Sequence, residues 1–212
     1  MTQILVFGAS STYGCWDIEG GWVQRLRKFL DQKVIDSDYE EYFITYNLGI
    51  DGDTAEGVFK RFESESKIRM WPDEETVFII SVGGNDSIFV HKTKKTKFST
   101  DQYKENLVKI ITLAKKYSDK IIFRGQTPID EEKVDPIPWL KDHSYKTEHV
   151  KEFDKITEIV AKENGLPFID VYKGLEKSDY KKLLVDGVHP NSKGHEKIFE
   201  IVKDFLIKER IL

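Results

Sequence analysis

Five short apolar runs recur along the chain, each rich in β-branched or aromatic residues and bounded by Gly, Asp or Pro. This pattern is typical of buried strands, which we expect at residues 4–7, 42–46, 77–82, 121–123 and 168–171. Between the runs, apolar residues spaced three and four apart predict amphipathic helices. The helical patterns cover residues 22–30, 58–62, 107–114, 150–160 and 198–206.

The alternation of strands and helices indicates right-handed crossovers and a parallel sheet covered on both faces. The expected fold class is therefore α/β: a three-layer α/β/α sandwich with a mainly five-stranded parallel sheet and a flavodoxin-like topology. With 212 residues, 39% of them hydrophobic, the chain can fill one core. No Gly/Ser-rich or Pro-rich linker divides it, so residues 1–212 are expected to form a single domain.

Composition narrows the range of partners. The 33 basic and 37 acidic side chains nearly balance, so no basic field favours nucleic acid. The Lys-rich run HKTKKTKF, residues 91–98, is expected to be a solvated loop rather than an anion-binding patch. No apolar run approaches the ~18 residues of a membrane span, and no targeting segment precedes the first strand, so we expect a cytoplasmic protein. Cys15 is the only cysteine. It excludes an internal disulfide and a multi-cysteine metal site, and is expected to be a small packed residue.

Ligands of open α/β sheets bind outside the carboxyl ends of the strands, which directs attention to the residues after each run. The first run leads directly into two serines flanked by glycines, in ILVFGASSTYG, residues 4–14. Such a turn can present backbone N–H groups to a phosphate. It can equally expose a serine nucleophile, provided that a base and an oxyanion site come from elsewhere in the chain.

Two later loops contain candidate oxyanion donors. In NLGIDGDTAEG, Asp53 and Glu56 predict a capping box at a helix start, which leaves Gly52 just outside that N-terminus. The N–H of Gly52 is then suited to stabilise an oxyanion, or the glycine only serves the turn. In SVGGNDSIF, the side-chain amide of Asn85 is a neutral donor at a strand end, or it only bridges backbone groups.

The segment LLVDGVHPNSKGHEKIFEIV places Asp186 three residues before His189, ahead of a helix that Asn191 or Ser192 is expected to cap. The carboxylate can accept the Nδ1 proton of the imidazole and leave Nε2 free as a general base. A His before a Pro at a helix start also has ordinary structural uses. The conjunction of Ser, two oxyanion candidates and Asp–x–x–His at one sheet edge nevertheless favours catalysis.

These blocks resemble those of the SGNH hydrolases, also called the GDSL esterase and lipase family, across most of the chain. The family's Gly-Asp-Ser-Leu block is similar to GASS and implies Ser10 as the nucleophile. Its second-block glycine corresponds to Gly52, its Gly-x-Asn-Asp block to GGND with Asn85, and its Asp-x-x-His block to Asp186 and His189. The implied oxyanion hole consists of Ser10, Gly52 and Asn85.

The first block departs from the family pattern. The family's Asp is Ala9 here, and its Leu is Ser11. The lost carboxylate is not the base, so the departure concerns the positioning of the loop more than the mechanism. Ser10 stands second after Gly8, as the family's serine does, and is preferred to Ser11.

The resemblance implies a serine ester hydrolase that forms an acyl-enzyme with a small acyl ester and needs no metal or organic cofactor. The family includes esterases, lipases, thioesterases and carbohydrate deacetylases, and the sequence does not select among them. Residues 127–149 exceed an ordinary connection; Ile129 and Trp139 in this segment are expected to wall the substrate pocket, or to pack on the surface. The alternatives are a flavodoxin-like module that binds a flavin phosphate, and a catalytically silent, carbohydrate-binding relative.

Overall fold

The computed structural model describes residues 1–212 and contains a central sheet of five parallel strands in the order β2-β1-β3-β6-β8. Each strand lies on one of the five apolar runs of the sequence. Their bounds are β1 Thr2–Gly8, β2 Phe43–Gly49, β3 Glu75–Ser81, β6 Ile121–Arg124 and β8 Phe168–Ile169. The register pairs Gly8 with both Gly49 and Ser81, so three strands end at the same level.

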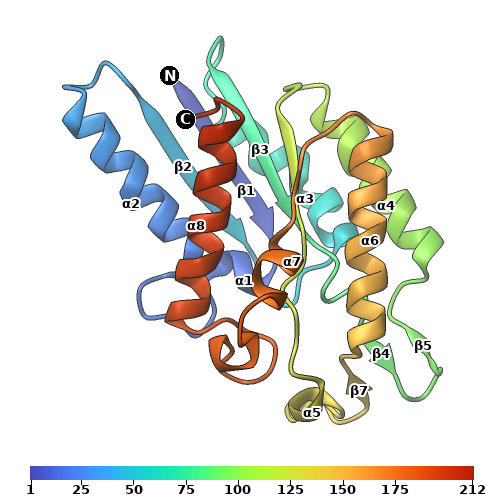
Figure 1. Ribbon diagram of the computed structural model, residues 1–212. Helices are drawn as coiled ribbons and strands as arrows, with labels where there is room; N and C mark the ends of the chain where they lie inside the picture. The colour runs from blue at the N-terminus through green and yellow to red at the C-terminus, as the bar shows by residue number, and fades with distance from the viewer.

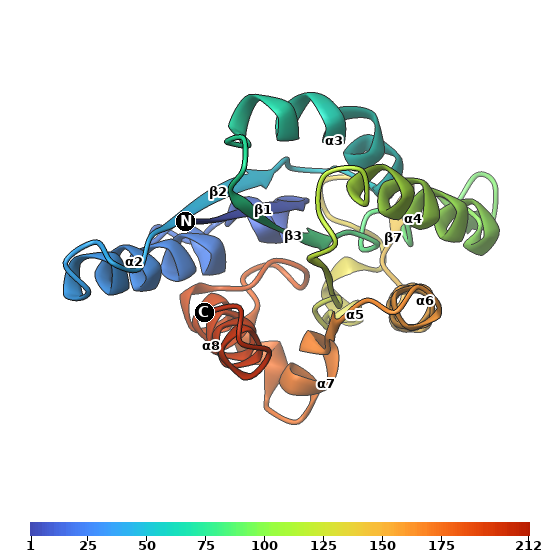
Figure 2. The same ribbon diagram turned by 90° about the horizontal axis from the view of Figure 1, so that it is seen from above.

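Helices cover both faces of this sheet, as Figures 1 and 2 show. One face is covered by α2 (Gly21–Asp36) and α8 (Ser192–Lys208), and the other by α3 (Ala55–Arg69), α4 (Thr100–Ala114) and α6 (Thr147–Glu163). The three-layer α/β/α class expected from the sequence is thus confirmed. No helix combines the length and the apolar character that crossing a membrane requires.

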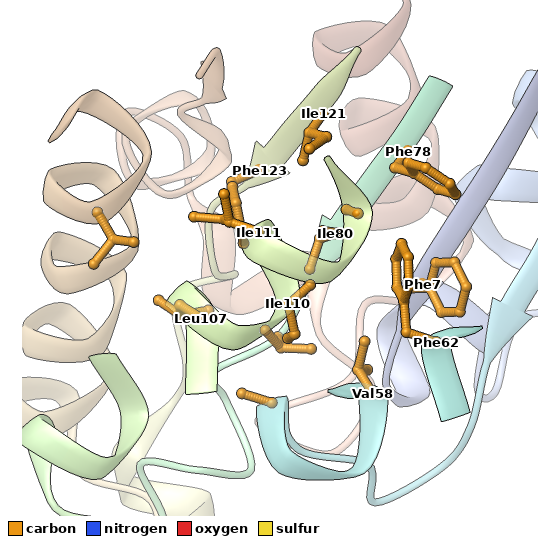
Figure 3. Close-up of a cluster of buried hydrophobic side chains, with 14 of the residues drawn as sticks. Phe7, Val58, Phe62, Phe78, Ile80, Leu107, Ile110, Ile111, Ile121 and Phe123 are labelled. Atoms are coloured by element: carbon orange, nitrogen blue, oxygen red, sulfur yellow. The ribbon is translucent and has the colours of Figure 1, made fainter. Parts of the chain in front are cut away.

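The alternation along β1 explains why both faces are buried. Leu5 and Phe7 point into the cluster beneath α3 and α4, whereas Ile4 and Val6 point to the cluster beneath α2 and α8. Figure 3 shows the first cluster, where the ring of Phe7 stacks on that of Phe62 with centroids 4.6 Å apart. Because both faces of the sheet are buried, its strands are apolar throughout. The sheet is therefore a rigid support for the loops at its edges.

Shorter elements gather at the carboxyl edge of the sheet, the lower edge in Figure 1. They are the helices α1 (Ser10–Tyr13), α5 (Glu131–Val134) and α7 (Val171–Glu176), and the 3-10 helix η1 (Tyr180–Leu183). A second, antiparallel sheet in the order β5-β4-β7 consists of β4 (Phe89–Val90), β5 (Lys95–Thr96) and β7 (His143–Ser144). The segment 127–149 supplies α5 and β7 of this group.

Three local expectations were wrong. The Lys-rich segment 91–98, expected as a plain loop, pairs with β4 through Lys95 and Thr96. The last strand stops at Ile169, because Asp170 caps α7 by accepting a hydrogen bond from the Lys173 N–H.

The third concerns the start of α3, where Asp53 and Glu56 do not form a capping box. The cap is Thr54, whose Oγ1 accepts from the Gly57 N–H at 3.2 Å. Asp53 instead pairs with Arg61 at 2.9 Å. Arg61 lies eight residues further along the chain, so a motif of three-residue spacing does not detect this pair.

Candidate active site

Ser10 lies where β1 turns into α1, at the end of an interior strand of the sheet, between β2 and β3. Its side chain is largely buried, and its Oγ is 3.0 Å from Nε2 of His189. The turn requires Gly8, because a Cβ there would lie 2.1 Å from Oγ1 of Thr12. Ser11, the other serine of the loop, has a buried hydroxyl without a hydrogen-bond partner. The tight turn therefore points Ser10, and not Ser11, at the imidazole.

His189 is held by Asp186 in the loop between η1 and α8. Its Nδ1 is 2.7 Å from Oδ2 of Asp186, while Oδ1 accepts the backbone N–H groups of Val188 and His189 at 3.0 and 2.9 Å. Burial alone would raise the pKa of Asp186, but the hydrogen bonds from His189 and Val188 outweigh it and lower the pKa to about 2. Nδ1 also lies 3.2 Å from Nε1 of Trp16. Because the ionised Asp186 is the closer partner and can only accept, it holds the proton of His189 on Nδ1, and Nε2 faces Ser10 as an acceptor.

Two further donors lie near the Ser10 hydroxyl. Gly52 and Asn85 line the same cavity as Ser10 and His189. Gly52 has a left-handed backbone (φ 73°), and its N–H has no acceptor in the protein. The N–H of Ser10, the first residue of α1, has no partner inside that helix either. These N–H groups therefore belong to residues that line one cavity with His189, and neither has an acceptor in the protein.

The amide of Asn85 is oriented from both ends. Its Nδ2 donates to the Asp53 carbonyl at 2.8 Å, and its Oδ1 accepts from the Tyr145 hydroxyl at 2.7 Å. One amide N–H remains free. Tyr145 comes from the segment 127–149, and no motif in the sequence marked it, since the contact joins positions sixty residues apart.

Two cavities meet at Ser10 and His189. The smaller, of about 50 Å³, is walled by Ile129 together with Val82 and Val188. The larger, of about 180 Å³, is walled by Trp139 and is open to solvent. The segment 127–149 thus contributes to both cavities, with Ile129 buried in one and Trp139 at the rim of the other.

Two exposed tryptophans flank the imidazole. The ring centroid of Trp16 lies 5.9 Å from that of His189, and that of Trp139 lies 6.1 Å away. Their side chains are 64% and 56% exposed. Trp16 also adopts left-handed backbone (φ 63°), which costs energy for a residue with a Cβ. Trp16 was not among the predicted site residues, although an aromatic residue just after a candidate nucleophile is a usable signal.

Cys15 is buried beside this site. Burial, together with the negative charges of Asp51 and Asp186, raises the pKa of its thiol to about 11. The thiol is therefore protonated at neutral pH and is a poor nucleophile.

The fold and the site together define a class: a three-layer α/β domain with a Ser–His–Asp constellation at the carboxyl edge of its sheet. The model of the GDSL-like lipase/acylhydrolase family matches residues 4–202. The chain belongs to this family, which supports ester hydrolysis as its general activity.

Solved structures show the same fold at low sequence identity. A lipase/acylhydrolase from Enterococcus faecalis is 24% identical with a TM-score of 0.74, and the match covers 97% of this chain and 95% of that one. An acetylxylan esterase from Geobacillus stearothermophilus, crystallised as a catalytic mutant, is 22% identical with a TM-score of 0.70, covering 96% and 92%. A lipolytic protein of the G-D-S-L family from Veillonella parvula is 22% identical with a TM-score of 0.69, covering 96% and 97%. No curated protein sequence matches the chain.

Proposed function

We propose that this protein is a serine ester hydrolase that cleaves short acyl esters through an acyl-enzyme. The observation that carries the proposal is the continuous hydrogen-bonded line from Asp186 through His189 to Ser10. Ser10 Oγ attacks the ester carbonyl carbon while Nε2 of His189 takes its proton. The ionised Asp186 stabilises the imidazolium that forms.

The N–H groups of Ser10 and Gly52 and the free amide N–H of Asn85 stabilise the tetrahedral oxyanion. Removal of one such donor typically costs about 3 kcal/mol of transition-state stabilisation. His189 next protonates the leaving alcohol. It then deprotonates a water molecule, which attacks the acyl-enzyme and releases the acid. Each step uses side chains, backbone and water only.

The size of the smaller cavity supports a short acyl group. One water needs about 10–15 Å³ of such space, so a cavity of about 50 Å³ holds an acetyl group or little more. We assign the acyl group to this cavity, against Ile129. We assign the alcohol to the larger cavity, against Trp139, whose exposed face suits a flat apolar surface. The acetylxylan esterase among the similar structures acts on an ester of this size.

A fluorophosphonate probe tests the proposed chemistry without any choice of substrate. We expect one covalent adduct by intact mass, located on Ser10 by peptide sequencing, since the probe reacts only with an activated serine. The adduct should be absent in His189→Ala and retained in Ser11→Ala. A folded wild-type protein that forms no adduct at neutral pH, or one labelled on Ser11, would contradict the mechanism and favour a binding role.

A pair of substitutions tests the two cavities separately. Ile129→Ala enlarges the acyl cavity, so the ratio of kcat/KM for butyryl over acetyl esters should rise roughly ten-fold. Trp139→Ala should leave that ratio unchanged. It should lower kcat/KM for acetates of large ring alcohols more than for methyl acetate. Steady-state assays on the folded variants give both ratios. If Trp139→Ala changed the acyl ratio and Ile129→Ala did not, our assignment of the cavities would be reversed.

A further inference from the structure

The only cysteine of the chain lies within reach of the proposed general base. The Sγ of Cys15 is 3.9 Å from Oδ1 of Asp51. Cys15 Sγ, a carboxylate oxygen of Asp51 and a ring nitrogen of His189 all lie within 4.8 Å of one another. The three residues come from separate segments: the turn after α1, the loop after β2 and the loop before α8. The fold therefore brings together three side chains whose atoms are all common ligands of zinc.

We propose that Cys15, Asp51 and His189 form a binding site for Zn²⁺, and that zinc bound there inhibits the enzyme. The binding part stands on the geometry of this cluster alone, whereas the inhibition rests on the proposed function. With bonds of about 2.0–2.3 Å, three tetrahedral zinc ligands lie roughly 3.3–3.7 Å from one another. The side chains need to approach by about 1 Å, which rotation about their χ angles can supply.

The surroundings suit an ion that enters from solvent. Asp51 is exposed, whereas Cys15 and His189 are buried. The side chain of Asp51 contacts the Cys15 thiol and no cationic group, so no lysine or arginine must be displaced before it can bind a cation. Water can occupy the fourth position of the tetrahedron. The thiolate ligand favours zinc over magnesium and calcium, which prefer oxygen. On binding, the Cys15 thiol releases its proton to solvent as the sulfur–zinc bond forms.

Inhibition follows from the bonds that His189 already makes. Its Nδ1 is bonded to Asp186 and its Nε2 faces Ser10. A zinc ion that binds either nitrogen must break one of these two hydrogen bonds. Loss of the bond to Asp186 leaves the imidazole without the carboxylate that orients it. Loss of the bond to Ser10 separates the hydroxyl from its general base. Either outcome prevents the activation of Ser10.

Cobalt(II) gives a test of binding that does not depend on activity. Because Cys15 is the only cysteine, any sulfur-to-cobalt charge-transfer absorption must come from its thiolate. We expect the wild-type protein to develop this band with one equivalent of Co²⁺ and to lose it when Zn²⁺ is added. Cys15→Ala should show no band. Asp51→Asn should need at least ten-fold more Co²⁺, whereas Asp73→Asn, an exposed acid at the opposite edge of the sheet, should match the wild type.

Zinc inhibition is the second measurement. The concentration of Zn²⁺ that halves fluorophosphonate labelling or ester hydrolysis should rise at least ten-fold in Cys15→Ala and Asp51→Asn, with activity in the absence of metal retained. A cobalt band without inhibition would disprove the inhibitory role. The absence of a band in folded wild-type protein, or equal inhibition of wild type and Cys15→Ala, would overturn the site. An esterase-inactive protein with a normal band would contradict the proposed function and leave the site standing.

Discussion

Tyr145 controls which way the amide of Asn85 points. Its hydroxyl donates to Oδ1 at 2.7 Å, so the NH₂ group must face the Asp53 carbonyl. Asn85 lines one cavity with Ser10. In Tyr145→Phe this anchor is lost while the buried ring stays. A neutral hydrogen bond contributes about 1 kcal/mol, so we expect kcat to fall about five-fold with little change in KM. Steady-state kinetics on a short acyl ester measures this split.

Asn85→Ala provides the reference for that measurement. It removes the oxyanion donor itself and should lower kcat by roughly 100-fold or more. Tyr145→Phe in the Asn85→Ala background should then have almost no further effect on kcat, because it acts through the amide. If the two losses multiplied instead, Tyr145 would act on the site by another route.

The predictable part of the site was the part encoded in short motifs. Asp186 and His189 stand three residues apart, and Ser10 stands in a turn between glycines, so residue type and spacing pointed to them. Tyr145 was missed because its contact with Asn85 joins distant segments. A hydroxyl sixty residues from its acceptor leaves no local pattern to read.

At the scale of elements, the start of α3 determines where Gly52 lies. Thr54 caps this helix, and both carboxylate oxygens of Asp86 accept the N–H of Ala55, at 3.0 and 3.2 Å. Removing the cap in Thr54→Ala should lower the free energy of unfolding by about 1 kcal/mol. Chemical denaturation measures the loss. Thr54→Ser keeps the hydroxyl and should stay near wild type.

Glu56→Ala distinguishes this cap from the capping box that the sequence suggested. Glu56 makes only an exposed pair with Lys60 at 3.1 Å, so its loss should cost about 0.5 kcal/mol or less. A loss for Glu56→Ala as large as that for Thr54→Ala would argue for the capping box after all.

Long, periodic helices such as α6 and α8 were predictable from their apolar stripes. Two-residue strands such as β4 and β7 were not, because they exist only through their pairing with each other.

At the scale of the whole molecule, the fold class followed from the order of the apolar runs, because alternating strands and helices of this length leave few topologies open. The sequence could not reveal which titratable side chains this packing buries. His195 on α8 has no exposed surface, and its Nδ1 accepts the Trp22 N–H of α2 at 3.3 Å. Burial lowers the pKa of His195 from 6.5 to about 4.

This buried histidine links stability to pH. A lowered pKa in the folded state means that the unfolded chain binds the proton more readily, so stability falls as the pH drops from 6.5 towards 4. At about 1.36 kcal/mol per pH unit, the difference between 6.5 and about 4 corresponds to about 3 kcal/mol. Asp86 acts in the opposite direction. Burial raises its pKa to about 7, so the free energy of unfolding falls as the pH rises towards 7. The two trends partly cancel in the wild-type protein.

His195→Asn separates the two contributions, since Asn keeps an acceptor for the Trp22 N–H but does not titrate. We expect the free energy of unfolding of the wild type, minus that of the variant, to shrink by about 3 kcal/mol between pH 7 and pH 4. Urea denaturation of both proteins at several pH values gives this difference directly. The cost of the substitution in packing is the same at every pH and does not affect the slope. A difference that stayed constant would mean that His195 is protonated as readily in the folded protein as in the unfolded chain.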